Sequence, residues 1–165
     1  MIEDSDDVRL PVFAREALGV LIAQLQTVKE AIRKLESQLQ AWHRSQQASQ
    51  RLTTMPGVGV ITATALVATI GDGSPFKSGR HLSAWLGLVP RQHSSGGKSR
   101  LGRISKRGDG FLRRLLVHGS RAVLRWRRGA PKQPSLWIRK LLTRRPTNVL
   151  LVVMANKTAR TVSGR

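Results

Sequence analysis

A serine- and glycine-rich basic segment holds the residues of this sequence best suited to chemistry on a phosphodiester. The adjacent hydroxyls of Ser94 and Ser95 precede two glycines and lie among cationic side chains. In one interpretation the segment only binds, because amides, hydroxyls and basic side chains together cradle phosphate groups. In the other, a serine hydroxyl attacks a phosphodiester while Lys98, Arg91 or Arg103 stabilises charge on the transferred phosphoryl group. Composition alone favours binding, because solvated Ser-Gly loops are common.

The same segment and the helix predicted after it carry most of the residues that we expect to contact nucleic acid. They are Arg91, Gly96, Lys98, Arg100, Arg103, Lys106, Arg107, Arg113 and Arg114. The run SSGGKS does not form a nucleotide-binding P-loop, because Gln92 stands where that motif requires its first glycine.

A second motif, MPGVG and its flanking apolar residues, has the spacing of a helix-hairpin-helix near residues 52–70. Gly57 and Gly59 would permit a tight turn with unusual φ and leave main-chain N–H groups free where the next helix begins. Such a helix start binds a phosphate without side chains, so we expect Pro56 and both glycines to contact the sugar-phosphate backbone. Ala63 is small where the two helices would cross. The alternative is that PGVG is only a tight interhelical turn.

Charge divides the chain near residue 50. Residues 1–50 have a net charge of −1, whereas residues 51–165 contain 23 basic and two acidic residues, a net charge of +21. A surface so one-sided repels itself, and a polyanion neutralises it. Nucleic acid is the usual partner, because each phosphate contact releases counterions. A surface for anionic lipid or for ribosome assembly is the alternative.

The two acids beyond residue 50, Asp72 and Asp109, are too few to ligate the ions of a two-metal nuclease centre. We therefore expect no metal or other cofactor in this chain. Asp109 is interpreted as a helix cap and Asp72 as a turn residue.

The elements that must position these motifs begin with one long helix over about residues 12–48. Its apolar residues recur at alternating spacings of three and four, which is typical of a coiled coil: Leu18, Leu21, Leu25, Val28, Ile32, Leu35, Leu39 and Trp42. The partner is either a second copy of the chain or a helix further along it. An ordinary amphipathic helix on a globular body is the alternative.

Later segments predict further helices and no sustained β-alternation. One spans about Ser78 to Leu86 with Ser78 as N-cap, and two shorter ones span about 135–143 and 147–160. Another follows Asp109 and ends at Gly129 and Pro131. Its predicted inward residues are Leu112, Leu115, Leu116, Val123 and Trp126; its predicted outward residues are Arg113, Arg114, Arg121 and Arg125.

The predicted fold is mainly α. A long N-terminal coiled-coil-type helix (domain 1–50, with an acidic leader) precedes a small basic helical domain (51–165) containing the helix-hairpin-helix and a Gly-rich basic loop. The sequence has no cysteine, no secretory signal and no apolar run long enough to cross a bilayer. We expect a soluble, cytoplasmic protein that does not enter the membrane.

Four blocks of sequence together resemble the C-terminal domain of a family of bacterial insertion-sequence transposases. They occur in that family's order within the run from residue 52 to about 160: MPGVGVITATALVATIGD, FKSGRHLSAWLGLVPRQHSSGGKSRLGRISKRGD, FLRRLLVHGSRAVL and NVLLVVMANKTAR. The family's enzymes have an N-terminal RuvC-like DEDD domain and are described as bridge-RNA-guided recombinases. The long helix resembles the coiled-coil connector between their two catalytic domains.

The resemblance implies more than composition does. In the family a serine of this Ser-Gly motif forms a covalent phosphoserine link to DNA, and metal-bound carboxylates of a RuvC-like domain from another protomer complete the site. By position Ser95 corresponds to that serine, with Ser94 second, so the resemblance favours a catalytic loop. The RuvC-like acids are absent from this sequence. We therefore expect the chain to be inactive alone, with Mg²⁺ required only where a RuvC-like domain is supplied in trans.

The leading hypothesis is thus the DNA-binding C-terminal part of a transposase that acts in DNA transposition. Its partners would be DNA, with a guide (bridge) RNA as a further candidate, and a second copy or a full-length transposase bound through the helix at 12–48. The alternative is a helix-hairpin-helix module that binds DNA or RNA without chemistry. A repair-type hairpin protein is a third hypothesis.

Overall fold

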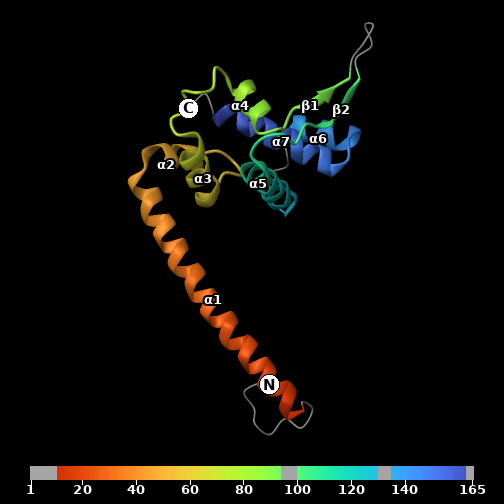
Figure 1. The fold of residues 1–165 in the computed structure, drawn as a ribbon. Coiled ribbons are helices and arrows are strands. Elements are labelled where there is room, and N and C mark those ends of the chain that lie inside the picture. Colours follow the sequence, from red (N-terminus) through yellow and green to blue (C-terminus); the bar gives the residue numbers. More distant parts are fainter. Residues whose placement is uncertain (1–10, 94–99, 130–134, 163–165) are drawn as a thin grey trace. The chain divides into compact units, whose positions relative to one another are not determined.

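A computed structural model describes residues 11–93, 100–129 and 135–162 of the chain, and helices predominate in these ranges (Figure 1). The predicted mainly α fold is confirmed, with two short strands in addition. Contacts divide the chain into two units, residues 1–42 and 43–165. No helix within the described ranges has both the length and the apolar composition needed to cross a membrane.

Helix α1, Val12–Ser45, confirms the long N-terminal helix. None of its residues is buried. The apolar seam that the spacing predicted is largely open to solvent: Leu21, Leu25, Val28, Ile32 and Leu35 are between 49% and 59% exposed. A solvent-facing apolar stripe of this length is the feature that a partner helix covers in a coiled coil.

The long helix ends three residues earlier than predicted. Gln46 has extended backbone angles (φ −109°, ψ 103°), and α2, Gln47–Thr53, begins directly after it. A side-chain bond across the break joins Nδ1 of His43 to Oγ of Ser49 at 2.7 Å, and Ser49 is completely buried. This contact forms only in the folded chain. The helix-favouring composition of residues 45–48 therefore did not predict the break.

The unit of residues 43–165 is a packed group of helices. After α2 come α3 (Val60–Ile70), α4 (Gly79–Trp85), α5 (Gly110–Gly129), α6 (Leu136–Arg144) and α7 (Thr147–Val162). Helix α7 packs against α4, α5 and α6, while α3 packs against α2 and α5. The helices predicted after residue 77 are confirmed to within two residues at each end, and Ser78 is confirmed as the N-cap of α4.

One main core and one smaller cluster hold this unit together. Leucines from α3, α4 and α5 meet alanines of α7 in the main core, which includes Leu66, Leu82, Leu112, Leu116 and Ala155. The smaller cluster joins the later parts of α5, α6 and α7: Leu124, Ile138, Leu150 and Leu151. Each fully buried leucine contributes about 1.5–3 kcal/mol of transfer free energy.

Two glycines let α5 touch the turn between α2 and α3 backbone to backbone. Gly57 has φ +87°, and a Cβ there would lie 2.9 Å from the carbonyl oxygen of Gly119. A Cβ on Gly119, in the middle of α5, would collide with the carbonyl oxygen of Gly57. A glycine inside a helix costs roughly 0.5–1 kcal/mol relative to alanine, so this close approach explains why α5 contains one.

Replacing Gly119 by alanine should therefore destabilise the protein although alanine is the better helix former. We expect the free energy of unfolding to fall by about 1–3 kcal/mol, because the added methyl group forces α5 away from the turn. Urea denaturation followed by circular dichroism measures the change. Gly19→Ala is the control, since Gly19 also lies inside a helix, α1, but has open space where its Cβ would lie. Equal stability of Gly119→Ala and the wild type would contradict the packing described.

Candidate nucleic-acid interface

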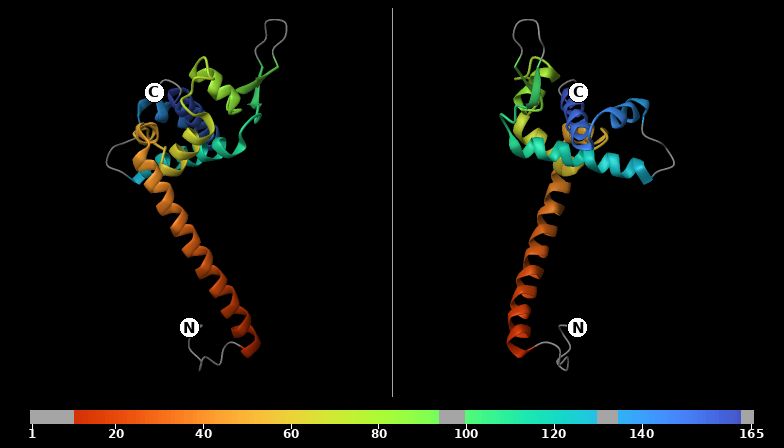
Figure 2. Two further views of the ribbon diagram at one scale, coloured as in Figure 1. Left: turned by 60° about the vertical axis from the view of Figure 1, so that its left-hand side comes forward. Right: turned by 90° about the vertical axis from the view of Figure 1, so that its right-hand side faces the viewer.

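The segment expected to be a Gly-rich loop contains a two-stranded antiparallel hairpin. Strand β1, Pro90–Gln92, pairs with β2, Leu101–Ile104, and the N–H of His93 donates to the carbonyl of Arg100 at 2.9 Å. The views of Figure 2 agree that the two strands extend outward from the helices of this unit. Nearly every strand residue is exposed, so neither face buries an apolar row. This explains why the sequence showed no alternation here.

Residues 94–99 between the strands lie outside the described residues. The predicted nucleophiles Ser95 and Ser94, and the predicted phosphate ligands Gly96 and Lys98, belong to this segment. The described strands and their flanks carry Arg91, Arg100, Arg103, Lys106 and Arg107, all of them exposed. The hairpin thus brings together the cationic residues that the sequence singled out on both sides of the serines.

The base of the hairpin is fixed by close backbone contacts with the end of α4. Gly87 (φ +69°) and Gly108 (φ +79°) have no room for a Cβ, because the backbones of Arg107 and Trp85 respectively lie against them. Lys106 adopts φ +56° while its N–H donates to the carbonyl of Gly87 at 3.1 Å. A left-handed conformation in a residue with a side chain is held by such surroundings. The direction in which the hairpin leaves the helices is therefore set by backbone packing.

The prediction that Arg113 faces outward from α5 is wrong. The Arg113 side chain is half-buried, and its Nη1 donates to the carbonyl of Leu86 at 3.0 Å and to that of Arg107 at 3.4 Å. The guanidinium group thus ties α5 to the two chain segments that frame the hairpin. Helical periodicity alone could not identify these acceptors, which lie directly after α4 and in the loop before α5.

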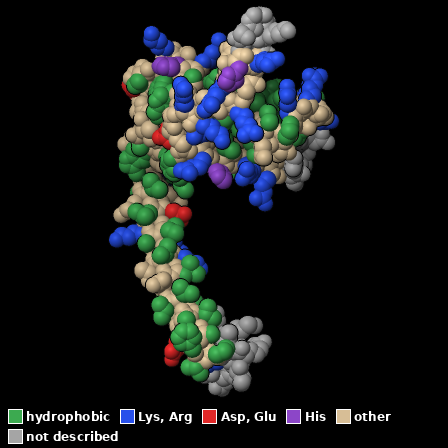
Figure 3. All heavy atoms as spheres, turned by 45° about the vertical axis from the view of Figure 1, so that its right-hand side comes forward, with side chains coloured by type: hydrophobic (Ala, Val, Ile, Leu, Met, Phe, Trp, Pro, Cys, Tyr) green, Lys and Arg blue, Asp and Glu red, His purple; other side chains and the backbone are tan. Residues whose placement is uncertain are grey.

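Helix α5 presents its other predicted basic residues to solvent. Arg114, Arg121 and Arg125 are exposed, and so is His118, which lies on the same helix. On the face drawn in Figure 3, Lys and Arg side chains predominate over acidic ones. An exposed row of arginines without neighbouring acids attracts phosphates.

The inward face of α5 is not quite the predicted one. Trp126 is 70% exposed, whereas Leu124 is only 3% exposed. The buried positions repeat every fourth residue from Leu112 through Leu116, and Ser120 continues the row because its hydroxyl donates to the Leu116 carbonyl. Because a polar serine interrupts the buried stripe, the pattern of apolar residues did not show which face of α5 is buried.

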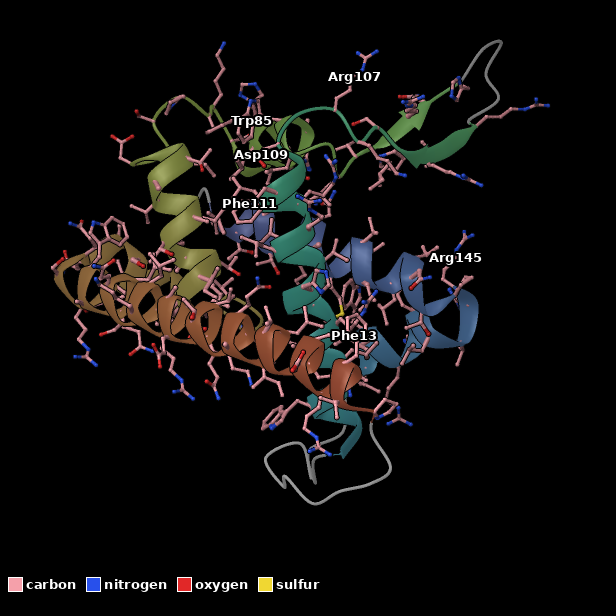
Figure 4. The ribbon with its side chains drawn as sticks, turned by 60° about the horizontal axis from the view of Figure 1, so that its bottom comes forward. Phe13, Trp85, Arg107, Asp109, Phe111 and Arg145 are labelled. Carbon is pink, nitrogen blue, oxygen red and sulfur yellow. The ribbon has the colours of Figure 1, made fainter. Side chains whose placement is uncertain are left out.

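Asp109 caps α5, as predicted. Its Oδ1 accepts from the N–H groups of Phe111 at 2.7 Å and Leu112 at 2.9 Å. Figure 4 shows Asp109 at the start of α5 near Trp85 and Phe111, with Arg107 directed away from them. An anion at this place also complements the positive end of the helix dipole.

The turn between α2 and α3 confirms only part of the predicted glycine geometry. Gly57 has the expected positive φ, but Gly59 does not; it is the N-cap of α3, with φ −88°. No side chain caps α3 there. Pro56 and Gly59 are exposed, and Ala63 is completely buried, as expected of a small residue at a helix crossing.

The described carboxylates of this unit do not form a metal site. Asp72 is a turn residue, as predicted: its Oδ1 accepts from the N–H of Ser74 at 3.0 Å, and this bond lowers the pKa of Asp72. Asp109 is occupied as a cap. No group of three His, Asp or Glu side chains in the described ranges could hold a metal ion. The residues present there therefore do not fit a Mg²⁺ centre.

The sequence interpretation missed one group of residues, a groove bordered by Arg80, Trp137, Lys157 and Arg160. These residues come from three helices. The only sequence signal was the pair of cations three residues apart near the end of α7, which a helix places on one face.

Comparisons with known proteins relate this chain to transposases. Residues 49–134 match the family described as Transposase IS116/IS110/IS902. A "Probable family 20 transposase" of Pseudomonas aeruginosa is 50% identical over 151 residues, which are 92% of this chain and 45% of that relative. The "Transposase for insertion sequence element IS1111A" of Coxiella burnetii is 43% identical over 96% of this chain and 44% of its own length.

A shorter match has a different kind of name. The "Pilin gene-inverting protein" of Moraxella lacunata is 51% identical over 45 residues, which are 27% of this chain and 14% of that protein. The chain spans less than half the length of each of these relatives.

The two adjacent arginines of α5 should behave differently when replaced. Arg113→Gln should lower the free energy of unfolding by about 1–3 kcal/mol, because carbonyls that accept from a charged donor lose it. Arg114→Gln, the matched control, should change stability by less than about 0.5 kcal/mol, as exposed substitutions do. Denaturant titration of both variants makes the comparison. If Arg113→Gln were as stable as Arg114→Gln, the guanidinium bonds would not hold the base of the hairpin.

Proposed function

Because the chain belongs to the Transposase IS116/IS110/IS902 family, we propose that it acts in DNA transposition by holding DNA on its basic 43–165 unit. The observation that carries this proposal is the exposed set of arginines on β1, β2 and α5, combined with acids that are engaged in local turns and caps. The relative named for pilin gene inversion acts, by its name, on the arrangement of a DNA segment. This supports strand exchange as the process served.

The α2–turn–α3 unit serves as a helix-hairpin-helix in this proposal. The first N–H groups of α3 have no side-chain cap, and Gly59 leaves open space beside them. A phosphate can approach such a helix start closely and is attracted by its dipole. Contacts of this kind position a duplex without reading its sequence, so we expect binding to tolerate many sequences.

Binding to duplex DNA should depend on salt and on exposed arginines. Arg114→Gln and Arg103→Gln should each weaken binding and lower the slope of log K against log salt by roughly 0.9, because a variant that neutralises one phosphate fewer also releases about one counterion fewer. Fluorescence anisotropy with a labelled duplex at several salt concentrations gives both quantities.

Arg33→Gln on α1 removes the same charge outside the proposed interface and is the matched control. If it changed the salt slope as much as Arg114→Gln, general net charge and not this surface would govern binding. A wild-type chain without affinity for DNA at low ionic strength would refute the proposed function.

Ser95 is the proposed nucleophile, with Ser94 second. Its hydroxyl oxygen would form a bond to a DNA phosphorus atom, and one phosphorus–oxygen bond to a deoxyribose would break. The serine gives up its proton, and the departing sugar oxygen takes one up, so the phosphodiester count is unchanged. Arg91 and Arg103 on the flanking strands would stabilise charge on the phosphoryl group as it transfers.

The carboxylates for this step would come from a second polypeptide joined through α1. The exposed seam of α1 has the spacing of a coiled coil, and burying it removes a long apolar stripe from water. We propose either a second copy or a full-length family member as the partner. A RuvC-like domain on such a member would supply Mg²⁺ and the acids that this unit does not offer.

A covalent adduct tests the nucleophile and the partner together. The chain is mixed with a full-length family member whose own matching serine is replaced by alanine, together with Mg²⁺ and labelled DNA. We expect a protein–DNA adduct on this chain in denaturing gels. Ser95→Ala should abolish it. Ile32→Asp should abolish it by breaking the seam, whereas Ile32→Val should retain it. An adduct that persists in both Ser95→Ala and Ser94→Ala would refute the assignment.

The second candidate is a binding module without chemistry. The engagement of Asp72 and Asp109 in local hydrogen bonds favours it, because neither carboxylate is left to assist a reaction. It predicts the same salt-dependent binding of DNA or structured RNA, formation of mixed oligomers through α1, and no adduct under any of the conditions above.

A further inference from the structure

A groove on the 43–165 unit is lined by the start of α4 and by residues of α6 and α7. Its volume is about 810 Å³, within the range of roughly 300–1,000 Å³ that is typical of ligand sites. A second hollow of about 330 Å³ shares Trp137, Lys157 and Thr161 with it and reaches Met55 and Pro56. The two hollows adjoin at these three residues, and we call them together the path between α4 and the turn that precedes α3.

The walls of the larger hollow are mostly cationic and polar, whereas the smaller hollow is largely apolar. Arg80, Lys157 and Arg160 line the larger hollow and are exposed, and no acidic side chain lines either hollow among the described residues. Gly79 lines this hollow and lies so close to the carbonyl of Arg160 that a Cβ would collide with it, so α4 and α7 meet here backbone to backbone. Three exposed cations around this contact suit an anionic ligand that runs along the surface.

Trp137 gives the groove an aromatic surface. Its side chain is 39% exposed, and the Nζ atom of Lys157 lies 4.7 Å from the centroid of its ring. A cation over an exposed ring is held more weakly than a stacked base. Because Lys157 is itself exposed, a base can take its place on the ring while the ammonium group moves to the adjoining phosphate.

We propose that this groove binds single-stranded nucleic acid, with an unpaired base stacked on Trp137 and its phosphates on Lys157, Arg160 and Arg80. A tryptophan next to several cations is the combination that non-sequence-specific single-strand binders use. An acidic peptide would use the cations but would leave the ring without a planar partner. The inference rests on the proposed function only in that nucleic acid is the ligand.

The connection to the turn gives the site a place in the proposed function. Pro56 borders the smaller hollow and lies in the turn that we propose contacts the duplex backbone. A strand leaving a duplex at the turn could therefore continue along the path to Trp137 without leaving the protein surface. This places unpaired nucleotides next to paired ones, as any strand exchange requires.

Anisotropy measurements with labelled 12-mers of oligo(dT) and oligo(U), and with a duplex, test the proposal. Trp137→Leu should weaken binding of the single strands about tenfold, because stacking on one aromatic ring is lost, and should leave duplex affinity within about twofold. Trp126→Leu removes an exposed tryptophan from α5, outside the groove, and should have no effect. Trp137→Phe should retain most of the affinity.

Further readouts separate stacking from charge and from folding. Oligo(dT) should quench the tryptophan fluorescence of the wild type and of Trp126→Leu, but much less that of Trp137→Leu. Lys157→Gln should lower the salt slope for single strands by roughly 0.7. Equal affinities for oligo(dT) and oligo(U) would show recognition of base and phosphate alone, whereas preference for oligo(U) would identify RNA as the ligand.

The proposal is overturned if Trp137→Leu and Trp126→Leu bind single strands equally, or if polyglutamate competes as well as oligo(dT). If Trp137→Leu does not fold, the other two variants decide. The proposal is then overturned if Trp137→Phe loses affinity for single strands and Lys157→Gln does not weaken their binding. Should these tests fail while Arg114→Gln still weakens duplex binding, the groove is wrong and the proposed function stands.

Discussion

Contacts between backbones at glycines are the constraint on which the 43–165 unit depends. Gly57 meets Gly119, Gly79 meets Arg160, and Gly87 and Gly108 meet Arg107 and Trp85. At each contact the main chains touch directly, with no side chain between them. One added methyl group would therefore push the two elements apart. The turn before α3, the groove and the base of the β-hairpin are the three places where this happens. Three of the proposed nucleic-acid contacts therefore rest on glycine positions that admit no side chain.

Charge acts against this packing. A net charge of +21 over residues 51–165 repels itself in a compact unit. Arg113 is half-buried, yet main-chain carbonyls hold it. The carbonyl oxygens accept hydrogen bonds from its guanidinium group, so no carboxylate is needed as its partner. The exposed arginines of α5 keep their charge for a polyanion, and Asp72 and Asp109 are used where a turn or a helix needs an acceptor. Arginines thus serve two purposes in this unit: Arg113 stabilises the fold, and the exposed arginines of α5 are left for the proposed binding of nucleic acid.

The sequence predicted the helices well because their signals are local. Ser78 and Asp109 mark helix starts by their own side chains, and the seam of α1 repeats over many turns. It was less accurate where side-chain packing decides the outcome. The break at Gln46 is accompanied by a contact between His43 and Ser49, and Trp126 faces solvent while Ser120 belongs to the buried row. The strands were missed because a hairpin exposed on both faces needs no alternation. The same holds for the candidate site. The exposed basic residues could be predicted from the sequence, whereas the groove could not, because its lining comes from three separate helices.

The distribution of acids and bases in this unit is consistent with the proposal that it forms one half of a phosphoryl-transfer site. Attack by a hydroxyl needs stabilisation of the charged phosphoryl group and also a group that removes the hydroxyl proton. In the proposed reaction the hairpin arginines would meet the first need. The carboxylates of the unit cannot meet the second, because Asp109 is held by two N–H groups at the start of α5 and Asp72 by the N–H of Ser74. Moving an acid into the hairpin would also weaken its attraction for phosphates. The proposed placement of the acids on a separate domain would resolve this conflict, and in that proposal the exposed seam of α1 is the surface that recruits such a domain.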